Sequence, residues 1–193
     1  MEKIDNQDID LSLLKGKRGV IMGVANDHSI AWGIAKALNN AGAELAFSYQ
    51  SDTLKKRVDP LASQLNSKIV LPCDVESSEN ITDFFSKIAS SWGSIDFVVH
   101  AIAFSDKSQL KGNYYHTTKD NFIKTMLVSC YSFTEIARES QKFMPNGGSL
   151  LTLTFGGSNR VMPNYNAMGI AKAGLEASVK YLASDFGEKN IRV

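Results

Sequence analysis

The sequence has no excess of charge of either sign and no long apolar segment. Its 193 residues hold 21 Lys and Arg against 20 Asp and Glu, which gives a net charge of +1. This balance offers no electrostatic argument for binding nucleic acid or an anionic membrane. No apolar run approaches the roughly 18 residues of a membrane-spanning helix. The acidic start, MEKIDNQDID, lacks the basic and then apolar pattern of a secretory signal.

Cysteine and histidine are scarce. Cys73 and Cys130 are far apart and form no CxxC pair, so we expect two reduced core residues and a cytoplasmic protein. His28, His100 and His116 lack the spacing of metal ligands, and we predict no metal site.

Short apolar segments alternate with amphipathic ones along the chain. We expect strands at 18–23, 44–49, 68–71, 95–102 and 149–155, a sixth opening at 191–193, and helices at 30–38, 51–65, 78–92, 119–143 and 164–187. Pro60 should kink or break the second helix. Continuously apolar strands joined by helices are typical of a parallel sheet covered on both faces. The prediction is a Rossmann-like, doubly wound α/β fold in a single dinucleotide-binding domain over residues 1–193.

The loop after the first strand is the first candidate binding site. In such sheets, ligands bind beyond the carboxyl ends of the strands. Gly23 would let backbone approach a phosphate, while Ser29 and Ile30 would offer free N–H groups at a helix start. Gly33 would permit close packing of helix on strand. The loop is not a GxGxxG motif, so the sequence of the loop alone fits an ordinary glycine turn without a ligand as well as it fits a phosphate-binding loop.

The ends of the next two strands add to this site. Gln50 stands where a dinucleotide fold places the residue that meets the adenosine ribose, and Asp74 and Val75 suit the adenine ring. No arginine directly follows the second strand to bind a 2′-phosphate, which favours NADH. Lys55 and Arg57 lie a little further on and leave NADPH as an alternative.

A tyrosine and a lysine in the last predicted helix are the candidate catalytic pair. Tyr165 and Lys172 are seven residues apart, or two helical turns, and would share one face. Reduction of a ketone or an enoyl group needs a proton donor near the acceptor oxygen and a cation beside it. A nearby ammonium and the helix N-terminus would favour the phenolate form of Tyr165. An exposed, non-functional Tyr and Lys is the alternative.

These residues resemble the short-chain dehydrogenase/reductase superfamily, and within it the divergent bacterial and plastid enoyl-acyl-carrier-protein reductases. The resemblance covers residues 14–193. The matching segments are Gly23 with SIAWG at 29–33, AELAFSYQ at 43–50, CDV at 73–75, HAIAF at 100–104, and PNYN at 163–166 followed by MG at 168–169 and AKA at 171–173. The wide Tyr–Lys spacing and the Ser-Ile-Ala-x-Gly helix start distinguish this branch.

The resemblance implies reduction of the trans-2 double bond of an acyl chain on acyl carrier protein, in type II fatty-acid biosynthesis. It implies that NADH delivers hydride to the β-carbon, that Tyr165 binds the enolate oxygen and that Lys172 holds the ribose. It also implies a homotetramer, inhibition by diphenyl ethers such as triclosan, and a fatty-acyl contact at Ser105. The implied cofactor-binding residues are Gly23, Ser29, Ile30, Gln50, Asp74, Val75, Ile102 and Lys172.

The sequence departs from the family in two respects. The family has a second tyrosine where this chain has Phe155, which has no hydroxyl. We expect Phe155 to shape the acyl pocket and Tyr165 alone to contact the oxyanion, because strand alternation turns Thr154 to the other face. The family also continues past Val193 through a substrate lid and a further strand, so we expect the acyl pocket of this chain to be open.

Two other functions remain as alternatives. A carbonyl or pteridine reductase of the same superfamily would share the fold and the Tyr–Lys pair. A non-catalytic dinucleotide sensor would share the fold but would need neither a proton donor nor an oxyanion contact.

Overall fold

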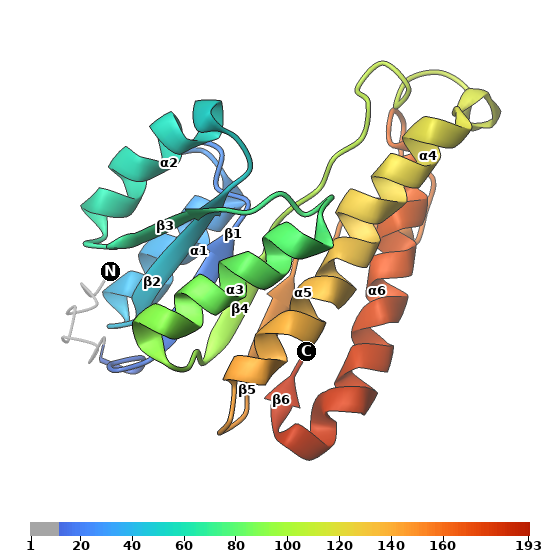
Figure 1. The fold of residues 1–193 in the computed structure, drawn as a ribbon. Helices are drawn as coiled ribbons and strands as arrows, with labels where there is room; N and C mark the ends of the chain where they lie inside the picture. The colour runs from blue at the N-terminus through green and yellow to red at the C-terminus, as the bar shows by residue number, and fades with distance from the viewer. Residues whose placement is uncertain (1–11) are drawn as a thin grey trace, which may run out of the picture.

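The computed structural model describes residues 12–193, which contain one six-stranded parallel sheet (Figure 1). The strands are β1 (Arg18–Met22), β2 (Glu44–Tyr49), β3 (Ile69–Pro72), β4 (Phe97–His100), β5 (Gly148–Thr152) and β6 (Ile191–Arg192). Every neighbouring pair is parallel, and the order is β3-β2-β1-β4-β5-β6. The predicted Rossmann-like fold is confirmed. The predicted lack of a secretory signal concerns residues 1–10, outside the described residues.

Helices cover both faces of this sheet (Figure 1). The α-helices are α1 (Ile30–Asn40), α2 (Asp52–Gln64), α3 (Ser78–Trp92), α4 (Lys119–Met126), α5 (Ser132–Ser140) and α6 (Asn166–Phe186). The residues of α1 and α2 pack in one apolar cluster, and those of α3, α5 and α6 pack in another. The chain order reverses between β1 and β4, so the ligand site expected for this fold lies beyond these two strands.

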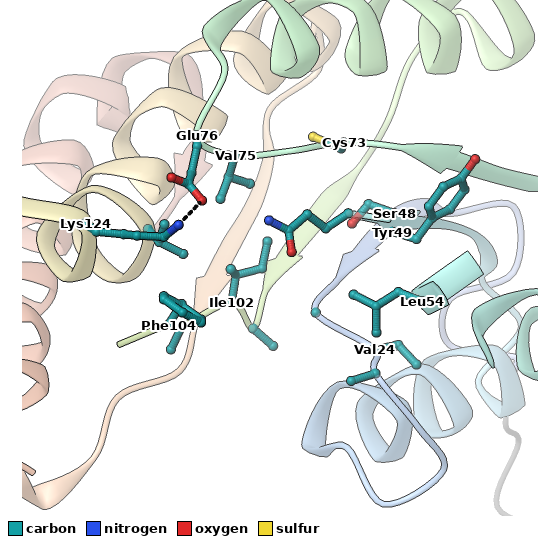
Figure 2. A pocket seen from close by; sticks show the side chains of 16 residues that line it. Val24, Ser48, Tyr49, Leu54, Cys73, Val75, Glu76, Ile102, Phe104 and Lys124 are labelled. Atoms are coloured by element: carbon teal, nitrogen blue, oxygen red, sulfur yellow. Dashed lines mark ion pairs between the residues drawn. The ribbon is translucent and has the colours of Figure 1, made fainter. Parts of the chain in front are cut away.

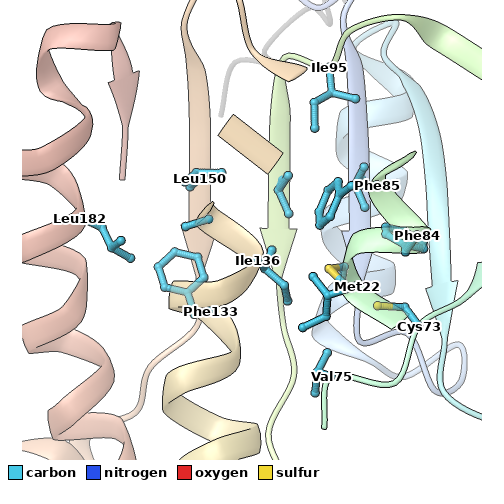
Figure 3. Packing of buried hydrophobic residues seen from close by; sticks show 14 of the residues in the cluster. Met22, Cys73, Val75, Phe84, Phe85, Ile95, Phe133, Ile136, Leu150 and Leu182 are labelled. Carbon is cyan, nitrogen blue, oxygen red and sulfur yellow. The ribbon is translucent and has the colours of Figure 1, made fainter. Parts of the chain in front are cut away.

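Side chains of β1 alternate between the two clusters. Ile21 points toward α1 and α2, while Val20 and Met22 point toward α3 and α5, and all three are fully buried. The cluster on the α3 and α5 face includes Phe85 and Phe133 (Figure 3). Fully burying one side chain of this size contributes about 1.5–3 kcal/mol, so the two clusters hold the helices to the sheet.

The predicted long helix at 119–143 is interrupted. A π-helical turn, Leu127–Tyr131, joins α4 to α5, and the 3₁₀ turn Gln141–Phe143 ends the run. Of the kink or break predicted at Pro60, the break is wrong, because α2 continues through this residue, which lies on the exposed side of the helix.

Four strands are shorter than predicted, and the two that differ most, β4 and β5, each end early at the candidate site. β4 ends at His100, after which residues 101–104 leave the sheet and line a cavity. β5 ends at Thr152, and the carbonyl oxygen of the next residue, Leu153, accepts a hydrogen bond from Lys172 at 2.8 Å.

Both cysteines are buried free thiols, as predicted. Burial raises the pKa of Cys73 to about 12, with the nearby Asp74 carboxylate adding to the effect. Within residues 12–193, no helix is long and apolar enough to cross a bilayer.

Candidate functional site

A cavity of about 230 Å³ opens beyond the carboxyl ends of β1 to β4 (Figure 2). Its lining comes mostly from the ends of these strands and the loops that follow them, with further residues from α2, α4 and the π-helical turn. It includes four of the predicted cofactor-binding residues, namely Gly23, Gln50, Val75 and Ile102. The other four, Ser29, Ile30, Asp74 and Lys172, do not line it.

Gly23 occupies a position that only glycine can fill. Its φ is +101°, and a Cβ built there would lie 2.1 Å from the carbonyl oxygen of Ala101. Neither the backbone conformation nor the space allows a side chain. The β1 backbone therefore passes directly beside the chain leaving β4, and the floor of the cavity is bare backbone.

The loop that follows Gly23 is closed by the side chain of Ser29. Its Oγ accepts hydrogen bonds from the N–H groups of Ala25 at 3.0 Å and Asn26 at 3.1 Å. The N–H of Ser29 donates to the carbonyl oxygen of Asn26 at 3.2 Å. The expectation of a free Ser29 amide is wrong, because the turn already uses it. Ile30 is 69% exposed, and neither residue lines the cavity.

The ends of β2 and β3 are joined by a polar contact. Nε2 of Gln50 donates to Oδ1 of Asp74 at 3.5 Å, and the same carboxylate oxygen accepts from the N–H of Glu76 at 3.1 Å. Asp74 does not line the cavity, whereas Gln50 does. The structure thus joins Gln50 to Asp74, two of the three residues predicted to meet the adenosine, and the third, Val75, lines the cavity with Gln50.

An ion pair that the sequence did not indicate bridges the cavity wall. Nζ of Lys124 on α4 lies 3.0 Å from Oε1 of Glu76, in the turn before α3 (Figure 2). The same ammonium lies 5.2 Å from the ring centroid of Phe104. The two partners are 48 residues apart in sequence, and no motif or spacing links them. Only the packing of α4 beside the β3–α3 turn brings them together.

Tyr165 and Lys172 occupy the first two turns of α6. Tyr165 is the N-cap residue, and Lys172 is buried with its Nζ donating to the carbonyl oxygen of Leu153 at 2.8 Å. Burial raises the pKa of Tyr165 and lowers the pKa of Lys172. The expectation that charge and dipole favour the phenolate is wrong here, since desolvation dominates. A protonated phenol can donate a hydrogen bond.

Phe155 packs against Tyr165 with an edge-to-face ring geometry. The loop that carries it is held to α6 by Glu176, whose Oε1 accepts hydrogen bonds from the hydroxyls of Thr154 and Ser158. These bonds lower the pKa of Glu176. Thr154 does not replace the missing tyrosine, because its hydroxyl is bound to Glu176.

Ser105 lies beside α4 in the structure. Its Oγ is 2.8 Å from Oγ1 of Thr125 and 3.4 Å from Oδ1 of Asn121. These bonds give the hydroxyl a structural partner in α4. The predicted acyl contact at Ser105 stays a prediction.

His100 is a fully buried residue beneath the site. Its Nδ1 is 3.1 Å from Oγ1 of Thr152, and its Nε2 is 2.9 Å from Oγ of Ser132. Burial lowers the pKa of His100 to about 3, helped by the positive charge of Lys172. The ring is therefore neutral at physiological pH and links β4, β5 and α5. In the part of the chain that the structure describes, no three His, Cys, Asp or Glu side chains could hold a metal ion.

A second, more open groove is lined in part by Tyr165. Residues 157–162 of the loop after β5 form one wall, and the first turns of α6 form another. Tyr114, from the loop between β4 and α4, completes the lining. Val161 and Met162 make much of this surface apolar, which suits an acyl chain.

Comparison with known proteins gives consistent matches. Residues 23–193 match a family model described as enoyl-(acyl carrier protein) reductase. The chain is 62% identical over 181 residues to enoyl-[acyl-carrier-protein] reductase [NADH] 2 of Rhizobium meliloti, covering 94% of this chain and 68% of that protein.

Solved structures of such enzymes superpose closely on the described fold. An Anaplasma phagocytophilum enoyl-(acyl-carrier-protein) reductase in complex with NAD has a TM-score of 0.92 and 57% identity, covering 94% of this chain and 69% of that one. The Bacillus cereus enoyl-acyl carrier protein reductase with NADP⁺ and indole naphthyridinone has a TM-score of 0.92 and 50% identity, covering 94% and 71%. The chain thus spans 68% to 71% of the length of these relatives.

Proposed function

Because the chain belongs to the enoyl-(acyl carrier protein) reductase family, we propose that it reduces the trans-2 double bond of enoyl-acyl carrier protein with NADH. The observation that carries the proposal is the placement of Tyr165 and Lys172 at the start of α6, the helix that follows the loop after β5. The cavity beyond β1 to β4 supplies a matching dinucleotide site. The family resemblance and the geometry therefore support the same reaction.

The residues of the cavity suit a dinucleotide. Gly23 leaves backbone uncovered where a pyrophosphate would approach, and Gln50 presents an amide that can bond ribose hydroxyls. Val75 and Ile102 offer apolar surface for flat rings. When bound, NADH supplies the hydride for the β-carbon. Ile30, Asp74 and Lys172 are the remaining proposed cofactor contacts, whereas the amide of Ser29 is already bonded to Asn26.

Tyr165 would act on the thioester carbonyl oxygen. Because burial raises its pKa, the phenol is protonated at neutral pH and can donate a hydrogen bond to that oxygen. A donor held in place before charge develops stabilises the enolate more than the ground state. Phe155 has no hydroxyl, so it contributes shape and not a second hydrogen bond.

Lys172 would hold the nicotinamide ribose and keep positive charge near the enolate. Its Nζ is anchored on the carbonyl oxygen of Leu153, and an ammonium has three donors. Two donors therefore remain for ribose hydroxyls. Because Lys172 is buried, its charge is less screened than a charge at the surface.

The proposal extends to partners and organisation. We infer a single domain, a cytoplasmic location, a homotetramer, and acyl carrier protein as the carrier of the substrate. Inhibition by diphenyl ethers of the triclosan type is part of the same proposal. NADH is the expected cofactor, and NADPH is the one to compare with it, because Lys55 and Arg57 lie near Gln50 in sequence.

The test is loss of NADH absorbance with a crotonyl thioester, using protein expressed from the complete gene. We expect NADH to be oxidised faster than NADPH, and a simple ketone to be left unreduced. Reduction of ketones or pterins but not of the enoyl thioester would favour a carbonyl or pteridine reductase. NADH binding without oxidation would favour a dinucleotide sensor.

A further inference from the structure

The loop between β4 and α4 is closed on itself by one glutamine. Oε1 of Gln109 accepts hydrogen bonds from the N–H and the Oγ1 of Thr118, both at 3.0 Å. Thr118 is the N-cap residue of α4, so these bonds hold the two ends of the segment 109–118 together at the start of α4. Such a closed loop can move as a unit unless something else holds it.

Asn166 holds this loop to the catalytic helix. Its Nδ2 donates to the carbonyl oxygens of Gln109 and Gly112, each at 3.3 Å. Asn166 is the first residue of α6 and directly follows Tyr165. One amide group therefore joins the loop to the helix end that carries the proposed proton donor.

The backbone at this junction is in an unfavourable conformation. Asn166 has a φ of +31°, and Asn164, on the other side of Tyr165, has a φ of +59°. Positive φ is uncommon outside glycine, although asparagine tolerates it better than most residues. Such conformations persist where surrounding contacts hold them and often occur at functional sites. The two bonds to the loop are contacts of this kind.

The loop so held contributes a wall of the groove beside Tyr165. Tyr114, Tyr165 and Asn166 all line this groove. Tyr114 is 48% exposed, so its neighbours alone do not fix it. The position of the Tyr114 wall relative to the Tyr165 hydroxyl therefore depends on the bonds from Asn166.

We propose that Asn166 is a positioning residue that fixes the 109–118 loop against the start of α6 and thereby sets the affinity for the acyl thioester. The effect on substrate affinity rests on the proposed function. The two hydrogen bonds from Asn166 to the loop do not depend on it. Asn166 acts on binding more than on chemistry, because its amide is bonded to the loop. Its loss should raise KM for the thioester about tenfold, since two neutral hydrogen bonds are involved, and should leave kcat nearly unchanged.

Two substitutions test this. Asn166→Asp keeps the shape of the side chain but removes the N–H donors. Asn166→Gly removes the side chain and accommodates the positive φ without strain, so it separates the lost bonds from misfolding. The control is Asn113→Asp, because Asn113 bonds only within the loop, to the hydroxyl of Tyr115 at 3.0 Å. Asn113→Asp adds the same negative charge to the same region but leaves the hydrogen bonds from Asn166 to the loop in place.

Hydrogen exchange of residues 109–118 and steady-state kinetics with crotonyl thioester are measured on each protein. We expect faster exchange and a higher KM in both Asn166 variants, with unchanged NADH affinity, and neither change in Asn113→Asp. Unchanged exchange in Asn166→Gly, or faster exchange with an unchanged KM, would overturn the inference. A wild-type protein without enoyl reduction would contradict the proposed function instead, and the exchange data would still decide whether Asn166 holds the loop.

Discussion

The ring of Phe155 meets the ring of Tyr165 edge-on, with the centroids 4.9 Å apart and the planes at 61°. Aromatic pairs of this geometry contribute about 0.5–1.5 kcal/mol beyond the area they bury. Phe155 can therefore orient the phenol of Tyr165 through ring contact alone. This arrangement is consistent with a site that uses one hydroxyl.

The first prediction follows from that contact. Tyr165→Phe removes the one phenol at this position, and turnover should fall by about 10²- to 10³-fold because the enolate loses its donor. NADH affinity should change little. The measurement is the rate of NADH oxidation with crotonyl thioester at saturating cofactor.

Phe155→Tyr is the matched comparison, since it adds a hydroxyl to the neighbouring ring. We expect it to leave turnover close to that of the wild type. Near-native turnover in Tyr165→Phe would exclude Tyr165 as the source of the oxyanion contact.

Replacing Gly23 or Gly33 by alanine should change the stability of the protein in opposite directions. Gly23→Ala should lower the free energy of unfolding by at least about 2 kcal/mol, because its Cβ would collide with the Ala101 carbonyl at a positive φ. Gly33→Ala should instead raise it by about 0.5–1 kcal/mol. Gly33 lies within α1, and a Cβ there meets nothing within 4 Å. The expectation that Gly33 allows close packing on the strand is thus wrong. Urea unfolding of both variants is the measurement, and equal effects would contradict the prediction.

The buried imidazole of His100 predicts a pH dependence of stability. Its pKa is about 3 in the folded protein and 6.5 ordinarily, so below pH 6.5 the unfolded chain takes up a proton that the native state does not. The free energy of unfolding should therefore fall as the pH drops from 6.5 toward 3. The slope from this one group is at most about 1.4 kcal/mol per pH unit.

The comparison of His100→Gln with His116→Gln isolates this effect. His116 is exposed, so its replacement should leave the slope unchanged, whereas His100→Gln should reduce it. The informative range lies above about pH 5, where most carboxylates have already ionised. An identical slope in wild type and His100→Gln would show that the ring is protonated without unfolding.

The Glu76–Lys124 pair predicts a modest coupling in cofactor binding. Both side chains are partly exposed, so their interaction should be worth about 0.2–1 kcal/mol. NADH affinities of Glu76→Gln, Lys124→Met and the double variant form the cycle that measures it. We expect each single variant to bind NADH less tightly by up to about fivefold. If the two single substitutions change the free energy of NADH binding additively in the double variant, the interaction between Glu76 and Lys124 does not contribute to cofactor binding.

The sequence predicted the fold well because the fold depends on local patterns. The segments at 44–49 and 78–92 match β2 and α3 residue for residue, since each is a clean apolar or amphipathic pattern bounded by polar turns. The cavity residues Gly23 and Gln50 were found because strand ends mark the ligand edge of a parallel sheet.

The sequence failed where contacts between distant segments decide the outcome. Nothing local shows that Leu153 leaves the sheet to meet Lys172, or that burial outweighs charge at Tyr165. Lys124 and Asn166 were missed for the same reason, since their partners lie in other loops. Apolar periodicity predicts which face of a helix is buried, but not which carbonyl an individual polar group will reach.

The π-helical turn Leu127–Tyr131 accommodates one extra residue between α4 and α5 while the helices on either side keep their facing. Lys124 before the turn therefore reaches Glu76, and Ser132 after it reaches His100. Deleting one residue from the turn would restore regular α-helix with little rotation of Lys124 relative to Ser132. Deleting one residue from the last turn of α4 would instead rotate the residues before it by about 100° about the axis and carry Lys124 away from Glu76. A change of chain length would thus be absorbed at Leu127–Tyr131 and would disturb the cofactor cavity only in the helix before it.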